Sequence, residues 1–268
     1  MTSTAVVNKI KWACSARKAG HAGTLDPSAT GILAIALGEA TKTIPYVTEQ
    51  VKSYTFEVKW GEATDSDDSD GKIIQTSQVR PSEQDIIAIL PRFRGEIKQT
   101  PPFFSAVKIN GRRAYELARS GEDFDIESRS LFVSSLKLEK YISENSAILS
   151  LECGKGGYVR SIARDLGLEL GCYGHVKWLR RIASGSFNLS MAHSLDTILK
   201  LNKTSAVNNF ILPVELGLST IKHGTCTSTA AEKIKNGNSA PILCKGARTG
   251  DEIWVSYSEI PIALGKYE

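Results

Sequence analysis

The stretch Ala19-Gly-His-Ala-Gly-Thr-Leu-Asp-Pro-Ser-Ala-Thr-Gly31 places three glycines and one proline around a single aspartate, Asp26. Glycine adopts backbone angles that other residues avoid, so this composition predicts a tight loop that presents Asp26 and His21 to a cleft. An aspartate in such a loop can also serve only to cap the turn that follows it. The residue types alone leave both interpretations open.

Hydrophobic periodicity on either side of this loop predicts a chain of mixed α and β structure. Lys52–Trp60 alternates strictly, which is typical of a half-buried strand and places Tyr54 on its core-facing side. A helix is predicted at residues 3–16, with Thr2 or Ser3 as its N-cap, and another at 83–90, with a capping box of Ser82 and Asp85. A third helix is predicted at 158–170, and strands are predicted at 124–141 and 147–153. Residues 98–111 have neither period and are predicted to form a long loop.

The last sixty residues differ from the rest of the chain. Beyond Asn208, short apolar runs such as Ala240–Cys244 and Glu252–Ser256 are separated by glycine, asparagine and proline. This pattern predicts a small β-rich domain, with a boundary near residues 202–212.

Composition narrows the class of protein. The chain has 268 residues, of which 41% are hydrophobic, and a net charge of +4, which suits a globular protein and is compatible with a polyanionic partner. It has no apolar run of membrane-spanning length and no signal-peptide pattern, so we expect a cytoplasmic location. The five cysteines are irregularly spaced and the acidic run at residues 65–71 has Ser77 where a calcium loop needs glutamate, so we expect reduced thiols and no metal site.

The loop Gly20-His-Ala-Gly-Thr-Leu-Asp-Pro27, continued by Ala29-Thr-Gly31 and Gly38-Glu-Ala-Thr-Lys42, resembles the catalytic signature of TruB-type pseudouridine synthases. Further motifs in the family's order are Ser53-Tyr54, Thr64-Asp65, Asp70-Gly71, Gln99-Thr-Pro-Pro, Ser105-Ala-Val-Lys108, Gly111–Arg119, Gly156-Gly-Tyr-Val-Arg160 and Leu179-Arg-Arg181. The resemblance covers roughly residues 2–200. It implies an α+β catalytic domain with a mixed, largely antiparallel sheet at 1–205 and a PUA-like RNA-binding domain at 212–268.

The resemblance also implies an activity, which is isomerisation of the uridine in the TψC arm of tRNA. This reaction breaks the bond from ribose C1′ to N1 and joins C1′ to C5, so it requires no cofactor. Asp26 corresponds to the essential carboxylate, which can attack the nucleotide covalently or abstract a sugar proton. The sequence leaves both routes open.

Four further residues correspond to the family's substrate site, although each also has a purely structural interpretation. Arg160 is expected to pair with Asp26, which would keep the carboxylate ionised, but it could be a surface arginine. Tyr54 is expected to stack on the extruded base, although its strand alone predicts a core residue. His21 would fill the space that the base leaves, and Tyr158 would pack along the same pocket.

Basic residues are expected where RNA would lie, and the RNA contacts that we expect are Lys18, Lys108, Arg112, Arg113 and Arg180. Arg17, Arg119, Lys177 and Arg181 belong to the same clusters. Any of these clusters could instead be a solvated face. The segment at residues 99–124 matches the family's RNA-clamping insertion.

Two other functions remain open at this stage. A non-catalytic RNA-binding or tRNA-folding protein could retain the same scaffold, but the presence of Asp26, Tyr54 and Arg160 argues against it. A guide-dependent synthase is disfavoured because the chain lacks the long basic extensions of those relatives. We expect a monomer that acts without a guide RNA.

The start of the sequence departs from the family pattern. Family members begin with an apolar strand and an Asp-Lys-Pro-x-Gly turn just before the position of Thr2 and Ser3, and Met1 falls inside that motif. The sequence therefore suggests that translation begins upstream and that Met1 is an internal methionine.

Overall fold

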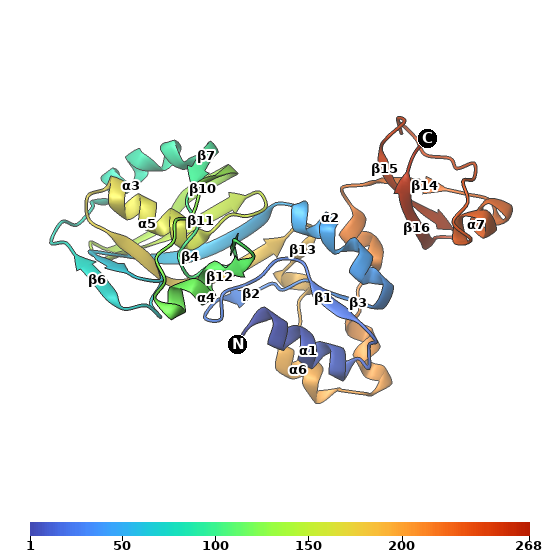
Figure 1. Cartoon of the computed structure of the whole chain (residues 1–268), viewed down its shortest axis with the longest axis horizontal. Helices are drawn as coiled ribbons and strands as arrows, with labels where there is room; N and C mark the ends of the chain where they lie inside the picture. Colours follow the sequence, from blue (N-terminus) through green and yellow to red (C-terminus); the bar gives the residue numbers. More distant parts are fainter. The chain divides into compact units, whose positions relative to one another are not determined.

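The computed structural model describes residues 1–268 and contains two compact units (Figure 1). The first unit comprises residues 1–5, 23–34 and 49–192, and the second comprises 6–22, 35–48 and 193–268. The expected boundary between 205 and 212 stays a prediction.

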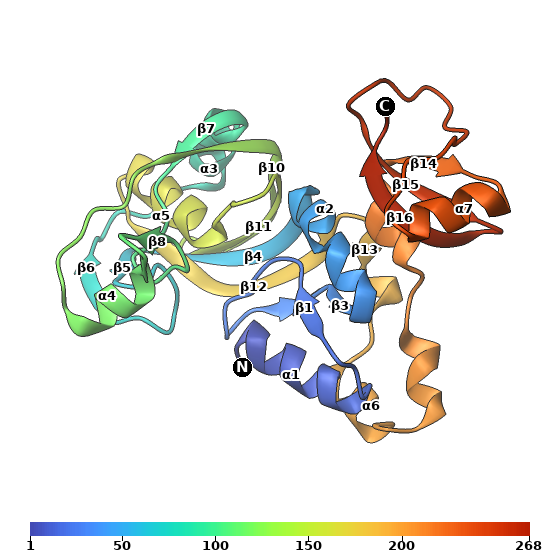
Figure 2. The same ribbon diagram turned by 45° about the vertical axis from the view of Figure 1, so that its right-hand side comes forward.

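The first unit is built around a sheet with the strand order β13-β12-β4-β11-β10-β7 (Figure 2). All neighbours on this path are antiparallel, whereas β2 pairs parallel with β12, which joins Thr30 to Arg180 and Gly31 to Arg181. The strands of this unit are β2 (Thr30–Gly31), β4 (Lys52–Trp60), β5 (Glu62–Thr64), β6 (Ile73–Thr76), β7 (Gly95–Gln99), β8 (Lys108–Ile109), β9 (Arg112–Arg113), β10 (Arg129–Ser143), β11 (Ser146–Cys153), β12 (Gly174–Ser184) and β13 (Phe187–Asn188). The predicted α+β class with a mixed, largely antiparallel sheet is confirmed.

The helices of this unit are α3 (Glu83–Ile89), α4 (Ala114–Ser120) and α5 (Val159–Glu169), with 3₁₀ turns η2 (Leu90–Phe93) and η3 (Leu189–Met191). The predicted capping box is present, because Ser82 accepts the amide of Asp85 and the Asp85 carboxylate accepts that of Ser82. Ile162 of α5 and Phe56 of β4 are fully buried in one core cluster. The sheet and α5 therefore pack together around one core.

Alternation along β4 agrees with the sequence prediction. Tyr54, Phe56, Val58 and Trp60 are all buried in the core cluster, and Trp60 is only 1% exposed. A row of large side chains on one face fixes the register of a central strand, since a slip by one residue would move them all to the other face.

The second unit contains β1 (Ala19–His21), β3 (Ile35–Leu37), η1 (Gly38–Thr43), α6 (Leu195–Lys200), η4 (Ser205–Phe210), η5 (Val214–Leu218), β14 (Lys222–Thr225), α7 (Ser228–Lys235), β15 (Glu252–Tyr257) and β16 (Ile260–Lys266). Helices α1 (Ser3–Ala13) and α2 (Ile44–Glu49) include residues of both units. The sheet β14-β15-β16 confirms a small β-rich C-terminal region.

One open alternative is decided and two local predictions are corrected. The N-cap of α1 is Thr2, one of the two expected candidates, whose hydroxyl accepts the amide of Ala5, whereas Ser3 bonds the backbone of Leu25. The strand expected from residue 124 begins at Arg129, because Phe124 instead packs edge-on against Phe103. Ala240–Cys244 is no strand and makes one isolated bridge to Thr225, since a proline within the run cannot donate to a ladder.

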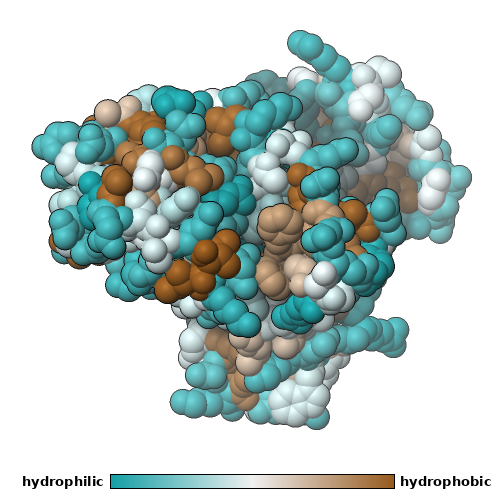
Figure 3. All heavy atoms as spheres, turned by 60° about the vertical axis from the view of Figure 1, so that its left-hand side comes forward, coloured by the Kyte–Doolittle hydropathy of each residue, from teal (hydrophilic) through white to brown (hydrophobic).

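The surface is mainly hydrophilic, with hydrophobic patches of limited size on the face that Figure 3 shows. Such a surface is ordinary for a folded protein. No helix of the chain is both long and apolar enough to cross a membrane.

The pairing of β2 with β12 predicts that Gly31→Ala will destabilise the protein. Gly31 has φ +97°, and an added Cβ would lie 2.1 Å from the carbonyl oxygen of Arg181. We expect a loss of about 1–2 kcal/mol from the backbone conformation and roughly 1–3 kcal/mol more from the overlap. Gly95→Ala is the matched control, because Gly95 has φ +79° with nothing near its Cβ position. An equal loss of Tm in the two variants would contradict the close approach of β2 to β12.

Candidate active site

The loop that carries Asp26 is held by bonds to its backbone. The hydroxyl of Ser3 accepts the amide of Leu25 at 2.9 Å and donates to its carbonyl at 3.1 Å. The guanidinium of Arg181 donates to the carbonyls of Gly23, Thr24 and Ile32 at 3.1, 3.3 and 2.7 Å. The backbone on both sides of Asp26 is thus fixed, while its side chain remains available.

The Asp26 side chain pairs with Arg160. Its Oδ1 lies 2.8 Å from a guanidinium nitrogen of Arg160, and the two side chains are 32% and 6% exposed. The predicted ion pair is therefore present. The turn after Asp26 is closed by its backbone carbonyl, which accepts the amide of Ala29, so the side chain does not cap that turn.

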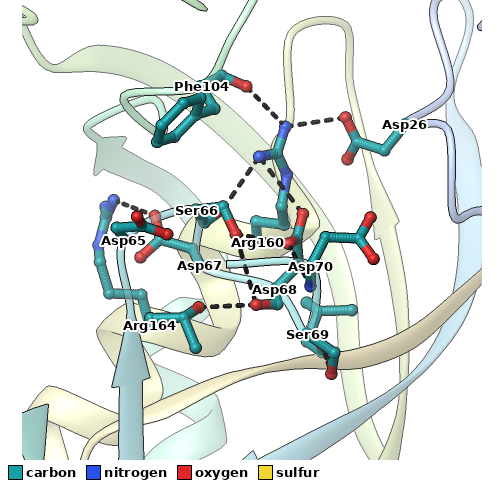
Figure 4. A network of polar contacts seen from close by, with 12 residues as sticks. Asp26, Asp65, Ser66, Asp67, Asp68, Ser69, Asp70, Phe104, Arg160 and Arg164 are labelled. Carbon is teal, nitrogen blue, oxygen red and sulfur yellow. Dashed lines mark hydrogen bonds and ion pairs between the residues drawn. The ribbon is translucent and has the colours of Figure 1, made fainter. Parts of the chain in front are cut away.

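Arg160 has three further partners, all from segments far away in the sequence (Figure 4). Its guanidinium donates to the carbonyls of Ser66 at 3.0 Å and Phe104 at 3.1 Å, and it lies 3.6 Å from a carboxylate oxygen of Asp68. An arginine that is buried needs such a set of acceptors, because its planar group carries five donors. The guanidinium is therefore fixed in direction by three other chain segments, at Asp26, at Ser66 and Asp68, and at Phe104.

The first turn of α5 places Arg160. Tyr158 precedes the helix, and its amide and carbonyl bond the side-chain amide of Gln99, at 2.9 and 3.1 Å. These two bonds join the start of α5 to the end of β7. Tyr158 itself is half-buried, and burial raises the pKa of its hydroxyl.

The acidic run at residues 65–71 contains partners of Arg160 and Arg164 that the sequence did not reveal. Asp68 accepts the hydroxyl of Ser66 at 2.5 Å and the amide of Asp70 at 3.1 Å, and Asp67 pairs with Arg164 at 2.9 Å. The carboxylates of Asp67 and Asp68 are thus turned toward arginines of α5. The available signal was the spacing of four residues between Arg160 and Arg164, which puts both on one side of a helix.

The surroundings of Asp26 raise the pKa of its carboxyl group. Burial raises the pKa of Asp26 above its ordinary value of 3.8, and Asp68 adds to this rise, whereas Arg160 opposes it. Without the arginine, burial would favour the neutral acid. Arg160 thus helps to keep a partly buried carboxylate ionised.

Tyr54 is 7% exposed and belongs to the core cluster. Burial raises the pKa of its hydroxyl to about 12, despite an opposing hydrogen bond with Arg181. Asp26 is close enough to Tyr54 to contribute to that rise. The strand alternation and the site assignment are thus compatible, because this tyrosine is a core residue whose hydroxyl end lies near the Asp26 loop.

A small pocket of about 50 Å³ lies at the ion pair. It is lined by Asp26, Ser28, Ala29, Asp68, Ser69, Asp70, Arg160, Val176, Lys177, Trp178 and Leu179. Glu57 holds two of these lining residues in place, because its buried carboxylate accepts hydrogen bonds from the indole of Trp178 and the ammonium of Lys177. The pocket therefore contains the carboxylate of Asp26, which is 32% exposed, beside its partner Arg160 and residues of β12.

The remaining predicted site residues have separate locations. His21 is the last residue of β1 in the second unit, where Lys18 pairs with Glu39 at 3.0 Å. Lys108 in β8 and Arg180 in β12 are exposed, Arg112 pairs with Glu122, and Arg113 donates to the Ala106 carbonyl. Their roles toward RNA stay predictions.

Arg181 requires a correction. The basic cluster in the sequence predicts a surface cation at this position, but Arg181 is 1% exposed and its guanidinium bonds loop carbonyls. Its neighbour Arg180 points outward, since adjacent residues of a strand face opposite sides. Arg181 is a structural support of the Asp26 loop.

Comparison with known proteins identifies the family of the chain. Residues 11–159 match the TruB family pseudouridylate synthase (N terminal domain), and residues 160–219 match the tRNA pseudouridylate synthase B C-terminal domain. The chain belongs to the TruB family. Proteins named tRNA pseudouridine synthase B from Ruegeria pomeroyi and Dinoroseobacter shibae are each 50% identical to it, and the alignments cover 100% of this chain and 88% of each relative.

Solved structures extend this likeness to the fold. The structure described as "Crystal Structure of a Cbf5-Nop10-Gar1 Complex" aligns with a TM-score of 0.74 at 25% identity, over 99% of this chain and 74% of that one. The TruB-family chain is accordingly an enzyme that forms pseudouridine in tRNA.

The geometry predicts that Arg160→Lys will lose most of its activity. A lysine is a point charge and cannot bond Asp26, Ser66 and Phe104 at once, so the carboxylate loses its orientation. We expect turnover to fall by about 100-fold or more, which corresponds to the roughly 3 kcal/mol typical of a disrupted buried pair. Arg92→Lys serves as the control for replacing an arginine, because Arg92 is exposed and pairs only with Glu169 on the surface. Turnover of Arg160→Lys near the wild-type rate would contradict the importance of the planar group.

Proposed function

We propose that this enzyme isomerises uridine 55 in the TψC arm of tRNA without a guide RNA, with Asp26 as its essential carboxylate. The observation that supports this most strongly is the ion pair of Asp26 with the buried Arg160, within a loop that matches the family's catalytic signature. The 50% identity to proteins named tRNA pseudouridine synthase B supports the choice of tRNA.

Asp26 has the chemistry that the reaction needs. Its carboxylate is 32% exposed and lines the pocket, so a ribose could approach it from solvent. Arg160 holds one oxygen, Oδ1, which directs the other oxygen away from the pair. An oriented and ionised oxygen can attack C1′ covalently or remove a sugar proton, and both routes remain within the proposal.

The other site residues act on the base and on the RNA in this proposal. Tyr54 stacks on the extruded uracil, Tyr158 packs along the same pocket, and His21 fills the space that the base leaves. The RNA backbone is bound by Lys18, Lys108, Arg112, Arg113 and Arg180. The exposure of Lys108 and Arg180 supports such contacts.

The proposal includes three further points. The reaction needs no cofactor or metal, because the atoms and electrons of the nucleotide are only rearranged. The enzyme acts as a monomer in the cytoplasm, where tRNA is modified. A non-catalytic tRNA-binding protein is the alternative, and the presence of Asp26, Tyr54 and Arg160, with Asp26 and Arg160 joined in an ion pair, argues against it.

The direct test uses unmodified tRNA transcript labelled with tritium at C5 of uridine. Wild-type enzyme should release tritium from the bare transcript. Asp26→Asn keeps the size of the side chain and removes its charge, so it should bind the transcript within about threefold of wild type and show no detectable release.

Asp196→Asn, at an exposed position in the first turn of α6, is the matched control and should remain active. Turnover in the Asp26→Asn variant would remove Asp26 from the mechanism. A wild-type enzyme that releases no tritium from bare transcript would contradict guide-independent catalysis.

A further inference from the structure

Helix α5 presents two arginines, one turn apart, to the same acidic turn (Figure 4). Arg160 bonds the Ser66 carbonyl and lies near the Asp68 carboxylate, on the side of Asp26. Arg164 bonds the carboxylate of Asp67 at 2.9 Å, and these two side chains are 22% and 12% exposed. The two arginines therefore bind alternate residues of one short segment.

The backbone of Asp67 explains this alternation. Its φ is +61°, a left-handed conformation that is uncommon for a residue other than glycine and persists where the surroundings hold it. Its carbonyl accepts the amide of Val176 at 3.0 Å, and its amide donates to the Thr64 carbonyl at 3.3 Å. The left-handed residue turns the chain so that Asp67 faces Arg164 while both of its neighbours face Arg160.

Arg164 is itself held on two other sides. Its guanidinium donates to the carbonyl of Thr100 at 2.8 Å and to the carboxylate of Asp165 at 2.9 Å. Burial raises the pKa of Asp67 to about 6, and Arg164 is the first group that opposes this rise. The cation thus supports the charge of Asp67, and the bond between them joins the acidic turn to α5.

We propose that Asp67 and Arg164 are positioning residues for pseudouridine formation, which hold the acidic turn against α5 so that Ser66 and Asp68 orient Arg160 toward Asp26. Neither residue lines the pocket, so they act through Arg160. The inference rests on the proposed role of Asp26. A small displacement of a reacting group lowers the rate of the chemical step much more than the affinity for substrate.

The test is a double-mutant cycle on the full-length chain with tRNA transcript. We would measure the single-turnover rate at saturating tRNA and the Kd for wild type, Asp67→Asn, Arg164→Met and the double variant. Asparagine tolerates the left-handed conformation and keeps the size of the aspartate, so it removes mainly the charge. Each single variant should lose about tenfold or more in rate with Kd within about threefold, and the double variant should lose no more than the worse single one.

Two further variants separate positioning from general loss of structure. Asp165→Asn removes the other carboxylate on Arg164 and should leave the rate within about twofold of wild type. Arg164→Lys keeps a charge near Asp67 and should recover part of the rate lost in Arg164→Met. It also replaces that variant in the cycle if Arg164→Met does not fold.

Multiplicative losses in the double variant, unchanged rates in both single variants, or an equal loss in Asp165→Asn would overturn the pairing. The Asp26→Asn variant separates a failure of the assigned role of Asp26 from a failure of the positioning role. If it retains turnover, the assignment of Asp26 fails. If it is inactive while the Asp67 and Arg164 variants keep wild-type rates, only the positioning role fails.

Discussion

A buried guanidinium is costly to fold unless most of its donors find acceptors, and Arg160 meets this constraint by contacting three other segments of the chain, although its Nε has no hydrogen-bond partner. Asp26, Ser66, Asp68 and Phe104 all approach it within 3.6 Å, and only 6% of its side chain is exposed. Loss of a single partner would leave a buried charge incompletely compensated. The pair of Asp26 and Arg160, which is the proposed chemical centre, is therefore also the point at which separate loops are held together.

The surrounding scaffold fixes each end of this pair independently. On the Asp26 side, Arg181 and Ser3 bond the loop backbone, and Gly31 lets β2 approach β12 closely. On the Arg160 side, Gln99 holds the start of α5. Rigid support on both sides gives a carboxylate that is oriented before substrate arrives, which is the condition under which positioning accelerates a reaction.

Local sequence patterns were sufficient for much of this architecture. The alternation of β4 predicted the core face that includes Tyr54, and the stripe of α5 and the capping box of α3 predicted two helices. The composition of the Asp26 loop marked it as special, but only the family resemblance suggested that the aspartate takes part in the reaction and is not a turn cap.

Contacts between distant segments could not be predicted in this way. Arg160 meets the Ser66 carbonyl 94 residues away, and a carbonyl carries no residue-type signal. The acidic run therefore looked like a failed metal loop, although its carboxylates bind arginines. Arg181 looked like a surface cation for the same reason, since its partners are the carbonyls of Gly23, Thr24 and Ile32.

If Arg160 keeps a partly buried Asp26 ionised, its effect is measured most directly as the pKa of the Asp26 carboxyl. Carbon-13 NMR of protein labelled at the aspartate carboxyl carbon follows this titration, and the Asp26→Asn spectrum assigns the resonance. We expect a pKa above 3.8 in the wild type, because burial dominates, and a higher pKa still in Arg160→Met, because the opposing cation is gone; this is the role that the structure gives Arg160. A wild-type pKa at or below 3.8, or the same pKa in both proteins, would contradict it.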